Sequence, residues 1–343
     1  MSSDTRSQAR LSTIAAFPPG FILENFVVRS DDSMLVTVAN HQEVWFVPSP
    51  ATAMPGEPLK LATFATIPTG IVEVEPDVFY ISTGKFYNSD EAFLHRLDLH
   101  GWVPGTLVEP EQVFQFPKNV RGLNGCCPLA PGVLLLADSF AGLIWRVDLP
   151  RDGGTAVARV WLQHESMGYY PGELKPEQPG VNGIRYAAKL SYIYYTATAK
   201  KLFMRVQVNP ETLEAVGEPE HVSVGRMVDD FCIDEDAGVA YLTTHRENTI
   251  DIVSLTPARN SERFIVAGDP FTEELIGPTS GAWSRSSGAY GKVAYFTADG
   301  GAVSPLPDGI RRPAKVLRAE LPPVPEVLRA MSQTDHAVTH SRR

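Results

Sequence analysis

The strongest constraint on the fold is a repeated three-strand pattern, which is most complete in residues 182–209. This segment, NGIRYAAKLSYIYYTATAKKLFMRVQVN, begins with a small polar pair and contains two β-rich runs, residues 192–196 and 202–208. A turn-like Ala-Lys-Lys sequence separates the two runs. The pattern predicts a three-stranded antiparallel meander. Strands of this length cannot bury both faces alone, so the meander needs neighbours of the same kind.

Five further segments of the chain carry the same pattern. With residues 182–209 included, the six repeats begin at Leu23, Thr69, Asn124, Asn182, Asp229 and Thr279. A spacing of about 45 to 60 residues is typical of the four-stranded blades of a propeller. The sequence therefore predicts an all-β fold, a six-bladed β-propeller of four-stranded antiparallel blades. A chain of 343 residues can form such a propeller as a single domain.

Apolar segments between the repeats are expected to supply the fourth strand of each blade. The predicted fourth strands are residues 59–67, 112–116, 157–162, 221–224, 264–267 and, in the last blade, 315–321. Residues 11–17 can also pair with the last blade, which would close the ring by joining the two ends of the chain. Residues 1–321 are thus assigned to one propeller, with residues 1–20 as the closing segment. Residues 322–343 are assigned to a flexible C-terminal tail.

Composition and charge argue against several classes of function. Charged residues make up 20% and hydrophobic residues 43% of the chain, as in proteins with a large core. The net charge of −10, without a basic stripe, argues against nucleic-acid binding. No apolar run approaches the roughly 20 residues of a membrane span. Three cysteines, two of them adjacent, predict buried thiols and a cytoplasmic location rather than a disulfide framework. The oligomeric state stays open.

The residues that open the six repeats predict a site on the propeller axis. In an antiparallel blade the first strand begins at the same end of the channel to which the turn between the second and third strands returns. The opening residues are therefore expected to converge there: Glu24, Thr69, Asn124, Asn182, Asp229 and Thr279. Two carboxylates and two carboxamides form an all-oxygen set suited to Ca²⁺ or another divalent cation. The alternative is that these side chains only hydrogen-bond backbone groups at the turns.

The same openings carry a resemblance to a known family. The sequences LEN, LNG, VNG and VDDFCID, followed by strands such as MLVT and VAYLT, resemble the gluconolactonase and senescence-marker-protein family of six-bladed propellers, with its strictosidine-synthase and paraoxonase relatives. The resemblance extends over residues 22–306. It implies a catalytic metal held by Glu24, Asn124, Asn182 and Asp229. The two acidic residues lack the family's usual Gly-Glu-Gly/Ser-Pro and Pro-Asp-Gly contexts, so the supports of the metal site differ.

Aromatic side chains are expected around the same mouth of the channel. Phe86 follows the second strand of its repeat, and residues 163–180 form an unusually long insertion between the third and fourth blades. A long loop with aromatic residues at a ligand face is typical of a lid. The alternative is a surface loop that packs its own tyrosines. The predicted substrate-binding residues are Phe86, Tyr169, Tyr170 and Thr279.

The sequence shows no activated nucleophile. It has no Gly-x-Ser-x-Gly elbow, no Cys/His zinc spacing and no phosphate-binding glycine loop. Covalent catalysis is therefore the least favoured enzyme hypothesis. Three functions remain: a pericyclase, a metal-dependent lactonase or esterase of the gluconolactonase type, and a non-catalytic binding platform.

The pericyclase hypothesis rests on a second resemblance. The first repeat, Leu-Glu-Asn-Phe followed by Arg-Ser-Asp-Asp-x-x-Leu-Val-Thr, is similar to fungal hetero-Diels-Alderases, biosynthetic propellers that join a tropolone-derived quinone methide to a terpene alkene. The resemblance implies polyketide and terpene substrates, held at near-attack distance, and one hydrogen-bond donor on the quinone-methide oxygen. No cofactor is required. The candidate donors are His41, Tyr87, Arg121, His245 and Trp283. The altered metal-site contexts favour this cyclisation over lactone hydrolysis, with the axial residues as a polar floor.

Overall fold

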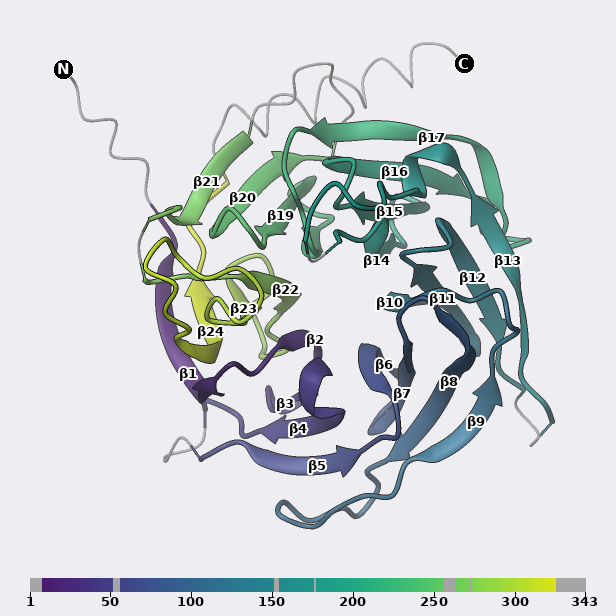
Figure 1. The fold of residues 1–343 in the computed structure, drawn as a ribbon, viewed down its shortest axis with the longest axis horizontal. Helices are drawn as coiled ribbons and strands as arrows, with labels where there is room; N and C mark the ends of the chain where they lie inside the picture. The colour runs from purple at the N-terminus through teal and green to yellow at the C-terminus, as the bar shows by residue number, and fades with distance from the viewer. Residues whose placement is uncertain are drawn as a thin grey trace.

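The computed structural model describes residues 8–51, 56–150, 154–175, 177–255, 263–271 and 273–324, the side chains of residues 88–90 excepted. These residues form six four-stranded antiparallel sheets around a central axis (Figure 1). The predicted six-bladed propeller is confirmed. Two short 3-10 helices, η1 (Ala39–His41) and η2 (Glu165–Met167), are the only helices in the described ranges. In the same ranges no helix is long and apolar enough to cross a membrane.

The six blades follow one another in chain order. Blade 1 comprises β2 (Leu23–Val28), β3 (Met34–Val38), β4 (Glu43–Val47) and β5 (Leu59–Thr63). Blade 2 comprises β6 (Ile67–Glu75), β7 (Val78–Lys85), β8 (Asn88–Asp98) and β9 (Glu111–Gln115). Blade 3 comprises β10 (Leu123–Ala130), β11 (Val133–Asp138), β12 (Leu143–Asp148) and β13 (Val157–Gln163). Blade 4 comprises β14 (Val181–Ala187), β15 (Tyr192–Ala197), β16 (Leu202–Val208) and β17 (Ala215–Val224). Blade 5 comprises β18 (Phe231–Asp234), β19 (Val239–Thr244), β20 (Thr249–Ser254) and β21 (Arg263–Gly268). Blade 6 comprises β22 (Pro278–Trp283), β23 (Val293–Ala298), β24 (Pro313–Glu320) and β1 (Arg10–Pro19).

Strand β15 shows why these segments become buried strands. Its sequence, YIYYTA, is rich in aromatic and β-branched residues, which favour a pleated, packed surface. Alternate side chains point to opposite faces, so Ile193 and Tyr195 pack with Leu135 of blade 3, whereas Tyr194 packs with Phe231 of blade 5. Both faces of a blade are therefore covered by its neighbours. Each fully buried side chain of this kind stabilises the fold by about 1.5–3 kcal/mol.

The ring is closed by the N-terminal strand. Strand β1 pairs antiparallel with β24, with Leu11 opposite Ala319 and Phe17 opposite Ala314. The prediction that residues 315–321 form the fourth strand is wrong, because β24 pairs with β23 and is the third strand of its blade. A long connection between β23 and β24 delays that third strand relative to the other blades. Residues 325–343 lie outside the described ranges, so the tail and its boundary stay predictions.

Side-chain hydroxyls join each of the first five blades to the next one near the axis. We call these contacts hydroxyl stitches, because each hydroxyl donates to a backbone carbonyl of the following blade. From blade 1 to blade 6 they are Thr37 to Thr69 (3.0 Å), Thr69 to Leu123 (2.9 Å), Ser139 to Val181 (2.7 Å), Thr198 to Val228 (2.7 Å), Thr196 to Asp229 (2.7 Å) and Thr243 to Thr279 (3.1 Å). The stitches fix the relative heights of the innermost strands. They therefore position the side chains at the mouth of the channel.

The junction of blades 6 and 1 is also held at the opposite end of the strands. Asp32, in the β2–β3 turn, accepts hydrogen bonds of 2.6 Å from the hydroxyls of Ser284 and Ser286 and from the N–H of Arg285. Asp32 is buried, and these hydrogen bonds, set against the cost of burial, hold the pKa of its carboxyl below the ordinary range. This contact complements the β1–β24 pairing.

The three cysteines are buried thiols, as predicted. None of Cys126, Cys127 and Cys232, all of which the structure describes, forms a disulfide. Burial raises the pKa of the Cys127 thiol to about 12 and raises the pKa of the other two as well. These thiols are therefore unreactive packing residues at neutral pH.

Candidate functional site

The residues that open the repeats lie at one end of the axis. They sit at the start of the innermost strands, which contact one another around the ring (Figure 1). In blades 1, 3, 4 and 6 the residue just before the opening residue pairs with the last residue of the second strand of the same blade. The pairs are Leu23 with Val38, Leu123 with Asp138, Val181 with Ala197, and Pro278 with Ala298. The openings therefore share one level, as expected. We call Glu24, Asn124, Asn182, Asp229 and His245 the axial cluster.

Two carboxylates of the axial cluster repel each other. Burial, followed by the charge of Asp229, raises the pKa of Glu24 to about 8. Burial also raises the pKa of Asp229, to about 6, with further repulsion from Asp230. Both side chains keep partial solvent exposure, so solvent reaches them. Negative charge concentrated at such a partly buried position favours a proton or a cation.

The two carboxamides lie beside these carboxylates. Asn182 Nδ2 donates to Asp229 Oδ1 and, at 3.1 Å, to the Thr198 hydroxyl. Asn124 Nδ2 donates to Ser139 Oγ at 3.3 Å. The other amide atom, Asn124 Oδ1, is buried and accepts no hydrogen bond within the described part of the chain. An unsatisfied buried oxygen of this kind is costly unless a ligand contacts it.

The donor set of the axial cluster fits a hard divalent cation. No group of three or more His, Cys, Asp or Glu side chains in the described ranges is placed to hold a metal, so an ion at the axis would need carboxamide oxygens as well. A cation at the axis would use Glu24, Asp229 and the carboxamide oxygens, a set typical of Ca²⁺. Asn124 Oδ1 is the atom that supports this fit, because it lacks a partner among the described residues.

His245 joins the axial cluster through a contact that spacing did not predict. Its Nε2 lies 3.0 Å from Asp299 Oδ2, and both residues are buried. Asp299 also accepts the N–H of Gly301 at 2.8 Å and that of Val303 at 3.1 Å, which fixes the carboxylate. Burial alone would lower the pKa of His245, but the charge and hydrogen bond of Asp299 raise it to about 9. The imidazole is therefore protonated at neutral pH.

One sequence signal could have revealed this pair. His245 and Asp299 each follow the second strand of their repeats, as do Ser139 and Thr198 in blades 3 and 4. In a closed ring these equivalent positions are neighbours. The turns after the second strands place both residues at the mouth of the channel, and the order of blades 5 and 6 in the ring brings the carboxylate beside the histidine.

A second polar layer lies one residue further along the innermost strands. Asp230 accepts hydrogen bonds from Arg185 of blade 4 and, at 2.5 Å, from the Ser280 hydroxyl of blade 6. Burial raises the pKa of Asp230, although the charge of Arg185 opposes that rise. Gly183 makes this layer possible, because a Cβ there would lie 2.3 Å from Asp230 Oδ1.

Aromatic rings gather next to the axial cluster. We call Phe86, Tyr87, Phe140 and Tyr169 the aromatic shelf. Its centre is Phe140, whose ring centroid lies 5.6, 4.4 and 5.0 Å from those of Phe86, Tyr87 and Tyr169. Three of the rings come from turns of blades 2 and 3, and Tyr169 comes from the 163–180 insertion. The shelf thus joins three segments that are distant in the sequence.

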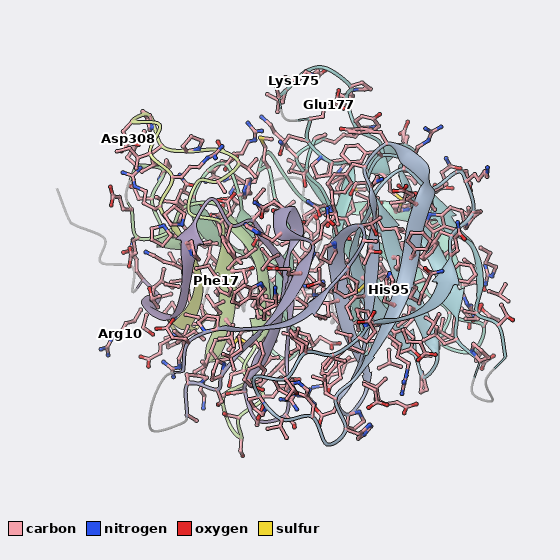
Figure 2. All side chains as sticks on the ribbon, turned by 60° about the horizontal axis from the view of Figure 1, so that its bottom comes forward. Arg10, Phe17, His95, Lys175, Glu177 and Asp308 are labelled. Atoms are coloured by element: carbon pink, nitrogen blue, oxygen red, sulfur yellow. The ribbon has the colours of Figure 1, made fainter. Side chains whose placement is uncertain are left out.

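The insertion reaches back over blade 2. The Tyr87 hydroxyl donates to Glu177 at 2.6 Å, and Lys175 and Glu177 project beyond the strand ends, at the same end as Asp308 (Figure 2). The pKa of Tyr87 is raised by burial and by this carboxylate. The base of the insertion is packed more firmly, since Met167 is fully buried. The geometry suits a lid with a fixed base and a tip that Tyr87 contacts through a hydrogen bond.

Other predicted site residues lie outside the axial cluster. His41 stacks on Phe21 with a centroid separation of 4.0 Å, and Tyr170 lies 5.5 Å from Lys200 Nζ. Arg121 is exposed, and its carbonyl accepts the N–H of Tyr87. Thr279 is buried and hydrogen-bonded to Thr297.

Trp283 is a packing residue rather than a donor at the channel mouth. It lies at the opposite end of β22 from Thr279, and four strand residues span about 13 Å. Its indole N–H donates to the Ile233 carbonyl at 2.6 Å, and its ring packs against Tyr241 and Tyr290.

One serine–histidine contact has the distance of a catalytic nucleophile and its base, but it has a local structural role. His164 Nδ1 lies 2.8 Å from Ser166 Oγ, but the same nitrogen accepts the Ser166 N–H and caps η2. Ser166 is buried and its hydroxyl also contacts the Tyr195 hydroxyl at 2.7 Å. The pair is therefore a local capping motif.

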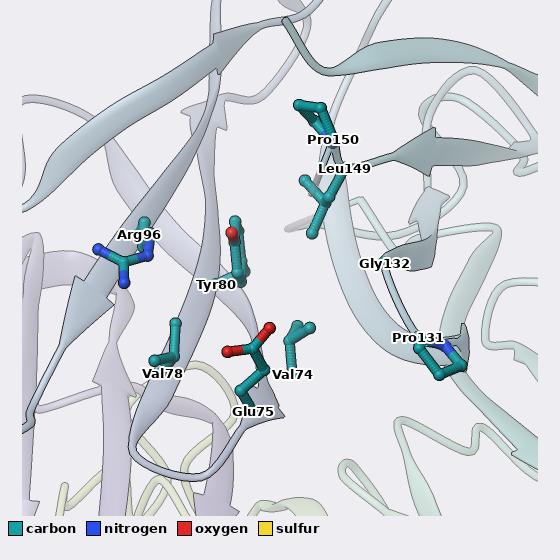
Figure 3. Close-up of a pocket in the computed structure, with 9 residues that line it drawn as sticks. All are labelled: Val74, Glu75, Val78, Tyr80, Arg96, Pro131, Gly132, Leu149 and Pro150. Carbon is teal, nitrogen blue, oxygen red and sulfur yellow. The ribbon is translucent and has the colours of Figure 1, made fainter. Parts of the chain in front are cut away.

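A groove on the other face of the propeller lies between blades 2 and 3. It has a volume of about 510 Å³ and is lined by Val74, Glu75, Val78, Tyr80, Arg96, Pro131, Gly132, Leu149 and Pro150 (Figure 3). These residues come from the strand ends opposite Thr69. Arg96 is paired with Asp98 there. The groove is thus separate from the axial cluster.

Comparison with known proteins supports the fold. No protein-family profile matches the chain, and no curated protein matches its sequence. Similar solved structures include a luciferin-regenerating enzyme, with a TM-score of 0.64, 14% identity, and coverage of 91% of this chain and 95% of that one. The calcium-binding protein regucalcin from Agrobacterium tumefaciens has a TM-score of 0.61 and 14% identity, with coverage of 90% and 95%. A gluconolactonase from Xanthomonas campestris has a TM-score of 0.61 and 12% identity, with coverage of 94% of both chains. At such identities the similarity establishes a shared six-bladed fold.

Proposed function

We propose that this protein is an enzyme of small molecules and that its axial cluster hydrolyses a cyclic ester with the help of a divalent cation. One observation carries the proposal: Glu24 and Asp229 repel each other beside the buried, unpartnered Oδ1 of Asn124, within the residues that the structure describes. A cation would relieve both costs. The fold shared with a gluconolactonase and with a calcium-binding protein supports the same assignment.

Glu24, Asn124, Asn182 and Asp229 would hold the cation. When bound, it supplies Lewis acidity, which polarises an ester carbonyl and stabilises developing negative charge. The chain's own contribution is orientation, since Thr198 and Ser139 hydrogen-bond the two carboxamides. The hydroxyl stitches hold these supports in place.

Asp229 and His245 divide the proton transfers. A bound cation would keep the carboxyl of Asp229 ionised, whereas His245, with a pKa of about 9, is protonated at neutral pH. Asp229 accepts a proton from the attacking water as the water oxygen bonds to the carbonyl carbon. His245 donates a proton to the ring oxygen as the carbon–oxygen bond breaks. Water and the cyclic ester are converted to a hydroxy acid, and the proton on Asp229 returns to His245 through solvent, which restores both residues.

Metal analysis and chelation test this proposal. We expect the purified protein to carry a stoichiometric divalent ion, and a chelator to lower its melting temperature and abolish hydrolysis of δ-lactones. A ligand at 100 times its Kd stabilises a protein by about 2.7 kcal/mol, which a melting curve resolves. Asp229→Asn should make the protein insensitive to the chelator. Asp236→Asn, an exposed residue paired with Lys189, is the matched control.

Two results would contradict the hydrolase. One is a metal-free protein whose melting temperature ignores added Ca²⁺ and chelator. The other is an Asp229→Asn variant that still responds to both.

The hetero-Diels-Alderase hypothesis is the second candidate, and one observation favours it. His245 is a protonated N–H donor, held in place by its contact with Asp299. A donor of this kind would make a quinone-methide oxygen more electron-poor while the two new bonds to the alkene form, with no leaving group. Polyketide and terpene partners need positioning and no metal.

A metal-free assay separates the two candidates. The chelated protein is mixed with a quinone-methide precursor and a cyclic terpene alkene, and adduct formation is compared with the spontaneous rate. Acceleration that survives chelation and is lost in His245→Ala supports the cyclase. If the protein accelerates neither cyclisation nor lactone hydrolysis, the non-catalytic binding platform remains.

A further inference from the structure

The aromatic shelf has a composition that the proposed chemistry does not explain. Cleavage of an ester needs the axial cluster, yet four aromatic rings gather around Phe140, the residue that follows the Ser139 partner of Asn124. Phe86 is 39% exposed and Tyr87 is 46% exposed, although both belong to a packed group of rings. Exposed apolar surface of this kind, next to a polar site, is typical of a surface that a ligand covers.

We propose that the aromatic shelf binds a flat aromatic body of the substrate and thereby selects aryl-bearing substrates over polyhydroxylated ones. This inference rests on the proposed function, because it places the reacting group of that substrate at the axial cluster. The shelf is the specificity-determining part of the site. The axial cluster is the reacting part.

The arrangement of the rings supports an aromatic partner. Phe140 meets Phe86 and Tyr169 edge to face, with interplanar angles of 69° and 86°. An edge-to-face contact covers a face of only one of its two rings, and Phe86 and Tyr87 keep exposed surface for a further ring. Each favourable ring pair contributes about 0.5–1.5 kcal/mol beyond its buried area. A sugar would need hydrogen-bonding groups instead. The Tyr87 hydroxyl is already engaged by Glu177.

The shelf and the axial cluster are connected through the backbone. Phe140 directly follows Ser139, whose hydroxyl lies 3.3 Å from Asn124 Nδ2. Phe140 is thus the chain neighbour of a residue that hydrogen-bonds the axial cluster. In this proposal the aryl ring of the substrate lies on the shelf while its ester lies at the axis.

A glycine makes room for the shelf. A Cβ on Gly122 would lie 2.6 Å from the Phe140 ring and 3.0 Å from the Phe86 ring. Any side chain there would displace both rings. The local sequence Arg-Gly-Leu-Asn thus combines a ring-supporting glycine with the axial residue Asn124.

Binding of 7-methoxycoumarin, a stable aryl lactone with fluorescence of its own, tests the inference. The titration uses the chelated full-length protein, so that hydrolysis does not contribute. We expect saturable binding that Phe140→Ala weakens about tenfold, the change that corresponds to about 1.4 kcal/mol. Phe271→Ala removes a ring that is 82% exposed and outside the shelf, and it should bind the probe as the wild type does.

Two further variants separate loss of probe binding from loss of folding. Phe140→Leu keeps an apolar side chain but removes the ring, and Gly122→Ala displaces the rings without deleting them. Both should weaken probe binding, while melting curves confirm that each variant is folded. The inference is overturned if the wild type does not bind the probe, or if the folded Phe140 variants bind it unchanged. Displacement of the probe by glucono-δ-lactone at equal concentration would also overturn it.

The outcomes for the two proposals are distinct. Probe binding that depends on Phe140, in a protein that ignores metal and hydrolyses no lactone, supports the shelf and rejects the hydrolase. Hydrolysis of simple aliphatic lactones by a protein that does not bind the probe supports the hydrolase and rejects the shelf.

Discussion

His245 and Asp299 are 54 residues apart in the sequence, and the closed ring brings their side chains within 3.0 Å. Two backbone N–H groups hold the Asp299 carboxylate in place, and that carboxylate in turn orients the His245 imidazole. Burial favours the neutral ring, whereas the charges of Asp299 and, to a smaller extent, Asp229 favour the protonated one. The pKa of about 9 shows that the charges dominate. His245 therefore stays protonated because of its charged neighbours, although its burial alone would favour the neutral imidazole.

Asp299→Asn should reveal this balance in the pH dependence of stability. Because the folded-state pKa of His245 lies above the ordinary 6.5, protonation stabilises the native state fully below pH 6.5. That contribution disappears as the pH rises through about 9. The chelated variant should melt below the wild type at pH 6, and the gap should narrow toward pH 10. Melting curves across that range measure the gap.

The control for this prediction is Asp236→Asn, which removes an exposed carboxylate from the ion pair with Lys189. Its melting temperature should follow that of the wild type at every pH. A constant gap between Asp299→Asn and the wild type, with no dependence on pH, would show that Asp299 acts on the loop alone.

Two glycines account for part of the pattern at the openings of the repeats. The small polar pair at Asn182 and Gly183 was expected to open a strand, and the structure gives the reason for the glycine: its missing Cβ leaves room for Asp230. Gly125 plays the same part in blade 3, where a Cβ would lie 2.5 Å from the Asn182 carbonyl. Close approach at the axis therefore selects glycine at the second position of these openings.

At the scale of strands, the hydroxyl stitches are the feature that connects one blade to the next. Thr37 illustrates them: its hydroxyl donates to the Asn25 and Thr69 carbonyls and accepts the Asn25 N–H, at 2.9–3.0 Å. Valine has the same shape but no hydroxyl. It would leave these buried backbone groups short of a partner.

Thr37→Val should therefore destabilise the protein by about 1–3 kcal/mol, the cost of an unsatisfied buried polar group. Equilibrium unfolding in urea measures the loss. Thr13→Val, at an exposed position of β1, is the control and should change the stability little. Equal unfolding midpoints for Thr37→Val and the wild type would show that the stitch contributes nothing.

The strands themselves were predictable, because runs such as residues 192–196 combine β-branched and aromatic residues between turn signals. Two errors came from reading proximity in sequence as proximity in space. Residues 315–321 follow a long connection, and their distance from β23 in the sequence favoured the fourth-strand position. They form the third strand because they pair with β23. Trp283 is close in sequence to Thr279, but a strand carries it to the other end of the blade. Strand direction, rather than composition, decides such cases.

At the scale of the whole molecule, ring closure depends on one strand from the N-terminus. Phe17 is 2% exposed in β1 and packs in the core between blades 6 and 1 with Val316 and Val36. Its ring also meets Trp45 of blade 1 at a centroid distance of 5.6 Å. The closing strand thus contributes apolar packing as well as backbone hydrogen bonds.

Phe17→Ala should lower the free energy of unfolding by about 3–5 kcal/mol, the usual cost of removing a buried aromatic ring. Urea unfolding of this variant and of Ser12→Ala, an exposed neighbour in β1, measures the difference. If both variants unfold at the wild-type midpoint, β1 is a peripheral strand and not the closure of the ring.

The fold was more predictable than the site for a physical reason. The strand pattern occurs in six repeats, so a wrong strand assignment in one repeat does not change the predicted number of blades. The axial cluster, by contrast, uses one residue from each of several blades. The openings predicted Glu24, Asn124, Asn182 and Asp229 as neighbours, but the role of Asp299 depended on a contact across blades.

The pairing of β1 with β24 has a consequence for the order in which the protein is made. The ribosome delivers the closing strand first and its partner last, so β1 stays an unpaired edge during the synthesis of five complete blades. The nascent chain must keep that edge from pairing elsewhere. The emergence of β24, rather than that of any earlier strand, is then the event that allows the ring to close.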